Sequence, residues 1–277
     1  MDLSLPTDLF AGASVFVTGG SSGINLAIAK AFVGCGASVA ICGRDADRLA
    51  DAVEQLDDVR PGSALGCVAD VRDAEAMATA INDAGRVHGP ISVLVCGAAG
   101  NFLAPAHELS PNGFRTVIDI DLNGSFNAAR TAFDQLRTTR GSVLFVSAGQ
   151  AFVPFGHQAH AGAAKAGIEM LMRNLALEWG QFGIRCNSIV PGPIAGTEGA
   201  NRLAAGVGGE EVWAQMVPLG RFGTTEEMAT MALLLASPWA SYVTGTTLVA
   251  DGGFALWGSG AFNTALAATR ESNDTQA

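Results

Sequence analysis

The stretch Val15-Phe-Val-Thr-Gly-Gly-Ser-Ser-Gly-Ile24 decides the fold, because it places a glycine-rich turn between an apolar strand and a helix. Glycines allow a tight turn and let the backbone approach a pyrophosphate closely. The helix that follows presents free N–H groups and the positive end of its dipole to that anion. A plain strand-to-helix connection also favours glycine, so the turn alone is weak evidence. At the start of a long strand–helix series it predicts a dinucleotide site.

The rest of the chain continues this alternation of strand and helix. Short apolar runs without polar interruptions are typical of parallel strands buried on both faces, and amphipathic segments separate them. We therefore predict a single-domain α/β protein, a Rossmann-type doubly wound parallel sheet of about seven strands with helices on both faces. The predicted strands are Ser14–Thr18, Ser38–Cys42, Ala64–Ala69, Ile91–Cys96, Ser142–Ser147, Arg185–Val190 and Thr246–Val249, and the main predicted helices are Asn25–Val33, Ala46–Leu56, Ala74–Ala84, Asn112–Arg137 and Gly162–Trp179.

The chain of 277 residues has no shift in composition and no internal repeat that would mark a second domain. We predict one nucleotide-binding domain over residues 9–256 and a loosely attached C-terminal tail over residues 257–277. The segment Pro191–Gly209 is rich in glycine and alanine with little periodicity. We expect it to be a flexible lid over a site at the carboxyl ends of the strands.

Composition excludes several classes of function. The net charge of −10 argues against a non-specific nucleic-acid surface. The longest uncharged helical run, near Met228–Ala236, is too short to span a membrane, and neither a signal peptide nor a peroxisomal address is apparent. We therefore expect a cytoplasmic protein without membrane contact.

The five cysteines lack metal-ligand spacing, so we expect buried free thiols and no metal or iron–sulfur site. They are Cys35, Cys42, Cys67, Cys96 and Cys186.

The end of the second predicted strand indicates which dinucleotide binds. An acidic residue there would bind the ribose hydroxyls of NAD, but the strand ends Ile41-Cys-Gly-Arg44. A guanidinium pairs well with a 2′-phosphate, which favours NADP, although Arg44 could instead pair with Asp45 or Asp47 on the surface. Asp70, at the end of the third strand, could accept from the adenine amino group or cap the next helix.

Six motifs spread along the chain agree with one family: Thr18-Gly-Gly-Ser-Ser-Gly-Ile24, Asp70-Val71, Ala98-Ala-Gly100, the helical Lys165, Pro191-Gly192 and Asp251-Gly-Gly253. From about Leu9 to Phe254 the chain resembles the short-chain dehydrogenase/reductases. Finer segments closely resemble the 2,4-dienoyl-CoA reductases within that family: Ala98–Phe102, Val117–Asp121, His160–Gly162, Pro191–Gly199 and Ala240–Gly245.

The chain lacks the tyrosine that most members of this family carry four residues before the lysine. Ala161 stands there, and the only tyrosine, Tyr242, lies far away. This helix is similar to that of the peroxisomal-type 2,4-dienoyl-CoA reductases. The mitochondrial type carries a tyrosine 15 residues before the lysine, where this chain has Gln150. The scaffold therefore predicts hydride chemistry without the usual proton donor.

The resemblance implies NADPH-dependent reduction of a 2,4-dienoyl-CoA or a related enoyl thioester. Hydride goes to the distal carbon of the diene, and the charge delocalises onto the thioester oxygen as a dienolate. That oxygen needs a hydrogen-bond donor more than an immediate proton, and water can protonate carbon afterwards. The alternatives are a family member that acts on another carbonyl or alcohol with a relocated donor, and a non-catalytic NADP-binding protein.

Four residues are predicted to be catalytic by this resemblance. Asp121 stands where the family has an active-site asparagine; Asp119 lies about 200° away on a helix, so only one of them faces the site. Asp121 could donate as a neutral acid, or be a structural aspartate bonded to nearby backbone. Lys165 would hold the nicotinamide ribose hydroxyls. Ser147 matches a family serine or threonine but could only cap its turn, and Asp251 contributes to the site or serves its turn.

The remaining predicted site residues hold the two ligands. The resemblance places substrate contacts at Arg72, Phe102, Ser110 and Arg202, although Arg72 could instead pair with Asp70 or Asp73 on the surface. His157 and His160 are predicted to start a helix or line the pocket rather than bind metal. The family also implies a homotetramer. The predicted cofactor residues are Gly19, Gly20, Ser21, Ser22, Gly23, Ile24, Arg44, Asp70, Val71, Lys165, Pro191, Gly192, Ile194 and Thr197.

Overall fold

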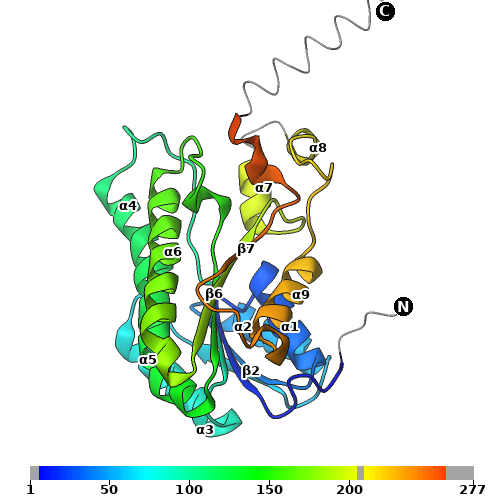
Figure 1. Ribbon diagram of the computed structural model, residues 1–277. Coiled ribbons are helices and arrows are strands. Elements are labelled where there is room, and N and C mark those ends of the chain that lie inside the picture. The colour runs from blue at the N-terminus through cyan, green and yellow to red at the C-terminus, as the bar shows by residue number, and fades with distance from the viewer. Residues whose placement is uncertain (1–5, 205–208, 260–277) are drawn as a thin grey trace, which may run out of the picture.

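A seven-stranded parallel sheet runs through the centre of the computed structural model, which describes residues 6–204 and 209–259 (Figure 1). The strand order is β3-β2-β1-β4-β5-β6-β7. All seven strands lie within two residues of their predicted bounds, because continuous apolar runs mark buried strands clearly. The strands are β1 (Ser14–Thr18), β2 (Ser38–Gly43), β3 (Ala64–Val68), β4 (Val93–Cys96), β5 (Ser142–Val146), β6 (Arg185–Pro191) and β7 (Thr247–Ala250).

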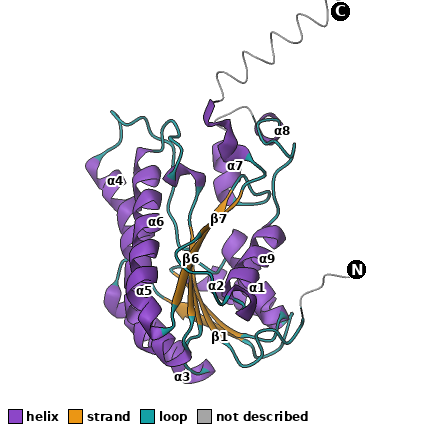
Figure 2. Ribbon diagram, in the orientation of Figure 1, coloured by secondary structure: helices purple, strands orange, loops and turns teal. Residues whose placement is uncertain are grey.

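Helices cover both faces of the sheet, which confirms the predicted doubly wound fold (Figure 2). Each face has its own buried apolar core between the sheet and its helices. One face carries α1 (Gly23–Gly34), α2 (Ala46–Asp57) and α9 (Thr225–Ala236), and the other carries α3 (Ala74–His88), α5 (Gly124–Thr139) and α6 (Ala159–Trp179). The shorter helices are α4 (Pro111–Ile118), α7 (Glu198–Ala204) and α8 (Glu210–Ala214).

The strand order reverses between β1 and β4, and this reversal positions the site. From β1 the chain proceeds outward to β2 and β3, then returns to pair β4 with the other side of β1. Ligands of such sheets bind outside the carboxyl ends of the strands at this switch point. The Thr18 hydroxyl at the end of β1 accepts from the backbone N–H groups of Gly97 (2.9 Å) and Ala98 (3.1 Å), which holds the two loops together there.

Two predicted segments differ from the structure. The predicted helix Asn112–Arg137 is two helices joined by a π-helical turn over Asp119–Asn123. The lid segment is not irregular throughout, because α7 forms within it; the Thr197 hydroxyl accepts from the N–H of Ala200 at 3.2 Å. Positions 205–208 of that segment and 260–277 of the predicted tail lie outside the described residues.

All five cysteines are buried and free, as expected from their spacing. Within residues 6–204 and 209–259, no three His, Cys, Asp or Glu side chains gather as a metal site would require. The helices of these ranges are all too short or too polar to cross a membrane.

Candidate active site

A cavity of about 830 Å³ opens at the carboxyl ends of the strands. Its phosphate end is the glycine-rich turn before α1. Gly19 has φ of 67°, and a Cβ there would lie 2.9 Å from Cα of Ala98, so the close approach requires glycine. The first turn of α1 contains no acidic residue, and Ser22 makes no side-chain capping bond. Its N–H groups therefore remain available for an anion, and the turn fits a pyrophosphate.

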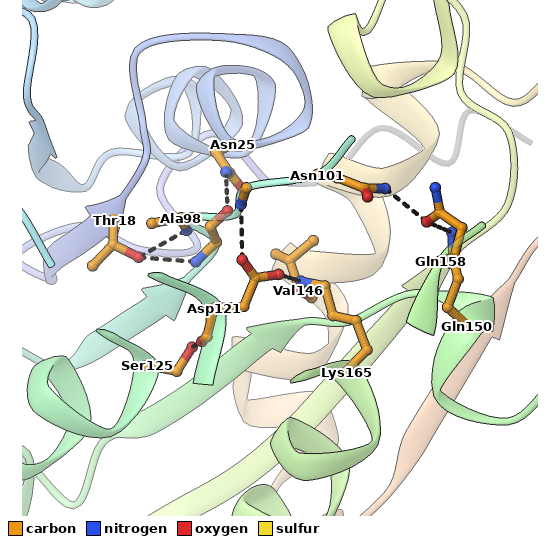
Figure 3. A network of polar contacts seen from close by, with 12 residues as sticks. Thr18, Asn25, Ala98, Asn101, Asp121, Ser125, Val146, Gln150, Gln158 and Lys165 are labelled. Atoms are coloured by element: carbon orange, nitrogen blue, oxygen red, sulfur yellow. Dashed lines mark hydrogen bonds and ion pairs between the residues drawn. The ribbon is translucent and has the colours of Figure 1, made fainter. Parts of the chain in front are cut away.

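Asn25, in the first turn of helix α1, supports the glycine-rich turn. Its Nδ2 donates to the carbonyl oxygen of Gly97 at 2.8 Å and to that of Gly19 at 3.3 Å. The side chain thus joins the phosphate turn to the loop after β4, where Thr18 also bonds (Figure 3). Sequence reasoning missed Asn25, because neither carbonyl partner can be inferred from a local motif.

At the adenosine end, Arg44 is exposed and lines the cavity. In the described part of the chain it takes part in no ion pair. Asp45 instead caps α2, accepting from the N–H groups of Asp47 and Arg48 at 3.1 Å each. Neither surface alternative for Arg44 is therefore formed, and its guanidinium can face a phosphate.

Asp70 lines the cavity but already has a partner. Nη2 of Arg72 lies 2.6 Å from Oδ2 of Asp70, and this bonded guanidinium lowers the pKa of the Asp70 carboxyl. Asp73, rather than Asp70, caps α3. The helix-cap alternative for Asp70 is wrong, whereas the surface-pair alternative for Arg72 is formed.

Lys165 and Asp121 both line the cavity and form a buried pair, whose side chains meet in Figure 3. Nζ of Lys165 lies 3.2 Å from Oδ2 of Asp121 and donates to the carbonyl oxygen of Val146 at 3.1 Å. Oδ1 of Asp121 accepts from the N–H of Gly100 at 2.8 Å. The Lys165 side chain is 10% exposed and that of Asp121 only 1%. Water therefore screens the attraction between them little, and this attraction holds the two side chains in position.

The π-helical turn between α4 and α5 gives Asp121 its position. Such turns are rare in proteins, and many of those that occur lie at functional sites. Asp121 is buried against the cavity, while Asp119 accepts from Nδ2 of Asn123 at 2.8 Å and does not line it. Both Asp121 oxygens act as acceptors here. Donation by Asp121 would require one of those two contacts to be replaced.

Ala161 lines the cavity one turn before Lys165 and contributes no polar atom beyond its backbone. The nearby Ser147 is buried, and its hydroxyl has no partner among the described residues. The alternative that Ser147 only caps its turn therefore has no bond to support it. A buried hydroxyl without a partner is costly, and a ligand oxygen in the cavity would satisfy it.

Amide side chains and an imidazole gather at the start of α6. Nδ2 of Asn101 donates to Oε1 of the buried Gln158 at 2.9 Å, and Nε2 of Gln150 approaches the same oxygen at 3.4 Å (Figure 3). His160 is fully buried and stacks on Phe102 with ring centroids 4.3 Å apart. Burial lowers the pKa of His160, which favours the neutral ring. His160 is the second residue of α6 and is not among the residues that line the cavity, so it fits the predicted helix start rather than the pocket wall.

An apolar wall completes the other side of the cavity. The rings of Phe155 and Phe254 lie 5.9 Å apart, those of Trp213 and Phe254 lie 6.2 Å apart, and Leu203 of α7 joins them. These residues come from four separate segments of the chain and carry no common motif. Sequence reasoning missed all four, yet together they give the cavity a continuous apolar surface.

The Pro191–Thr197 segment lines the end of the cavity where the nicotinamide was predicted to lie. A Cβ on Gly192 would lie 2.6 Å from Cα of Asp251, so the two turns pack backbone to backbone. The oxygens of Asp251 accept from the N–H groups of Gly253 and Ala255 at 2.8 Å each, which is the turn role expected as its alternative. Ile194 is buried, and the Thr197 hydroxyl donates to its carbonyl at 2.9 Å.

Most predicted residues meet in this one cavity. The predicted residues among its lining are Gly19, Ser21, Ser22, Gly23, Ile24, Arg44, Asp70, Val71, Asp121, Ser147, Lys165, Pro191, Gly192, Ile194, Thr197 and Asp251. Outside the lining lie Gly20, Arg72, Phe102, Ser110 and Arg202. Ser110 caps α4 and accepts from the N–H of Gly113 at 3.0 Å, while Arg202 donates to the carbonyl oxygen of Asn101. Substrate contacts by these outer residues stay predictions.

Comparison with known proteins gives matches over most of the chain. A family model described as enoyl-(acyl carrier protein) reductase matches residues 19–255. A peroxisomal 2,4-dienoyl-CoA reductase of Saccharomyces cerevisiae, named (3E)-enoyl-CoA-producing, is 43% identical over 92% of this chain and 87% of its own. A probable 2,4-dienoyl-CoA reductase of Bacillus subtilis, named (2E)-enoyl-CoA-producing, is 40% identical over 87% and 95%. A solved short chain dehydrogenase of Bacillus anthracis is 37% identical with a TM-score of 0.83, covering 89% of this chain and 97% of that one.

Proposed function

Because this chain belongs to the short-chain dehydrogenase/reductase family of oxidoreductases, we propose that it reduces a 2,4-dienoyl-CoA, or a closely related enoyl thioester, with NADPH. One observation carries this proposal: the buried Lys165–Asp121 pair lies beside Ala161, where a ketone reductase would need a tyrosine. The cavity therefore keeps its cation while lacking the usual proton donor. The names of the yeast and Bacillus relatives support the same reaction.

The cavity residues divide between cofactor and substrate. The phosphate turn and the α1 N-terminus hold the pyrophosphate, Arg44 takes the 2′-phosphate, and the Gly192–Thr197 segment holds the carboxamide. A bound nicotinamide supplies the hydride. The apolar wall of Phe155, Trp213 and Phe254 packs against the acyl chain.

Two polar groups, Lys165 and Ser147, stabilise charge at the thioester oxygen, and Asp121 positions the first of them. Two N–H groups of Lys165 face Asp121 and Val146, so its third N–H can approach the ribose or the substrate. The unpartnered Ser147 hydroxyl donates to the thioester oxygen. Asp121 holds Lys165 in place, and donation from Asp121 itself remains a separate proposal. The dienolate then collects its proton at carbon from water.

A panel of substrates tests this function. NADPH oxidation, followed by absorbance, is expected with 2,4-hexadienoyl-CoA and to be at least about 100-fold slower with simple ketones, because no tyrosine protonates an alkoxide there. Turnover of ketones alone would show a carbonyl reductase. Binding of NADPH without turnover of either class would favour a non-catalytic protein.

Exposed apolar side chains bear on the oligomeric state of the protein. We propose a homotetramer, supported by apolar side chains exposed on α6 and β7, among them Leu177 (83%) and Val249 (49%). Location in the cytoplasm stays a prediction, since the yeast relative is named peroxisomal and the name of the Bacillus relative gives no compartment.

A further inference from the structure

An ion pair crosses the mouth of the cavity at its adenosine end. Nη2 of Arg48 on α2 lies 2.9 Å from Oε1 of Glu198 on α7, 150 positions later in the chain. Both side chains line the cavity, as Arg44 does. The capping bond from the N–H of Arg48 to Asp45 fixes the backbone of Arg48 beside Arg44. Two arginines, four residues apart, thus line the cavity at the end where the 2′-phosphate is proposed to bind.

The carboxylates near Arg44 and Arg48 are mostly bonded to other groups, so an anion could pair with these two arginines. Asp45 is occupied by backbone N–H groups and Asp70 by Arg72. Arg44 forms no ion pair among residues 6–204 and 209–259. Glu198 is therefore the carboxylate that meets Arg48, and it does so from another element.

We infer that Arg48 is a second ligand of the NADP 2′-phosphate and that Glu198 occupies its guanidinium until this phosphate displaces it. The inference rests on the proposed use of NADP. The Arg48 and Glu198 side chains are 48% and 65% exposed, and such pairs contribute little to stability. A phosphate near its dianionic state forms stronger, charge-assisted bonds to a guanidinium than one exposed carboxylate does. Replacement of Glu198 by the 2′-phosphate at Arg48 is thus favourable when NADP binds. NAD has no 2′-phosphate and cannot make this replacement.

Glu198 has a second partner that receives it after displacement. Its Oε2 lies 3.9 Å from Nη2 of Arg202, one turn along α7, and Arg202 also donates to the carbonyl oxygen of Asn101. The 2′-phosphate therefore releases α7 from α2 and leaves the link from α7 to the Asn101 loop. NAD binding leaves Arg48 and Glu198 paired.

Calorimetric binding of 2′,5′-ADP and 5′-AMP at one ionic strength tests the inference without catalysis. Arg48→Ala is expected to weaken 2′,5′-ADP about 10-fold, while Glu198→Gln tightens it by up to about 5-fold, the range of an exposed pair. Neither variant changes 5′-AMP binding. In the double variant the Glu198→Gln gain disappears, because it acts through Arg48.

Two controls separate this inference from the cofactor proposal. Arg86→Ala removes an exposed arginine, paired with Asp83 on α3 and outside the active-site cavity, and should change neither affinity. Arg44→Ala tests the 2′-phosphate site itself. If the unmodified protein does not prefer 2′,5′-ADP to 5′-AMP, the use of NADP and the inference both fail. If it does, but Arg48→Ala leaves 2′,5′-ADP binding unchanged or the Glu198→Gln gain persists without Arg48, the inference alone is overturned.

Discussion

Replacement of Lys165 with methionine is expected to lower kcat/KM for 2,4-hexadienoyl-CoA by about 10²–10³-fold, the usual loss when one charge-stabilising donor is removed. Lys165 lines the cavity, and its Nζ stands between Asp121 and the Val146 carbonyl. Methionine keeps much of the apolar stem but brings no N–H to the thioester oxygen. Steady-state NADPH oxidation measures the loss.

Folding must be controlled in this experiment, because methionine leaves the 1%-exposed Asp121 without its cation. Breaking a buried pair on one side typically costs about 3–5 kcal/mol. Thermal unfolding and NADPH fluorescence should accompany the kinetics, with Lys165→Arg as the variant that retains charge. A folded methionine variant that binds NADPH and reduces the dienoyl thioester at more than about a tenth of the original rate would contradict the assigned role.

Asp121→Asn is expected to lower kcat by about 100-fold. Asparagine can still accept from the N–H of Gly100, but its neutral amide no longer attracts Lys165. The ammonium then loses the contact that fixes it beside the substrate. Comparison of kcat with KM, together with a thermal melt, separates this effect from weaker binding or folding.

The double variant shows whether the two residues act together. If Asp121 works through Lys165, the combined loss in Asp121→Asn with Lys165→Met stays close to that of Lys165→Met alone. A fully multiplicative loss would indicate an independent function for Asp121, such as donation to the dienolate. Unimpaired activity of Asp121→Asn would exclude both roles.

The fold was predictable because its signals are local. The strands are uninterrupted apolar runs, and the turn before α1 carries its own glycine pattern. The π-helical turn over Asp119–Asn123 escaped prediction, since it inserts a wider turn without altering composition. The helix α7 escaped because its glycine and alanine residues give no clear amphipathic period, although Thr197 caps its start.

Which residues line the cavity was predictable where a motif marks them, as at Lys165, Asp121 and the phosphate turn. It was not predictable where contacts join distant segments. The Arg48–Glu198 pair spans 150 positions, and the Asn101–Gln158 bond joins the loop after β4 to the start of α6. Such pairs follow from tertiary packing rather than sequence period. Ser110 is a different case, because its capping bond to Gly113 is local and the Ser110-Pro111 pair is a typical helix start that could have been recognised in the sequence.

Transfer of deuterium tests the central claim most directly. The protein is incubated with 2,4-hexadienoyl-CoA and NADPH deuterated at both C4 positions, so that transfer from either face is labelled. Mass spectrometry and NMR of the product are expected to show one deuterium at C5 of an enoyl-CoA, with one NADP⁺ formed per product. The remaining hydrogen, at C2 or C4, comes from water, and its place distinguishes a 3-enoyl from a 2-enoyl product. Unlabelled thioester, or NADPH consumed only when a ketone is supplied, would contradict the account.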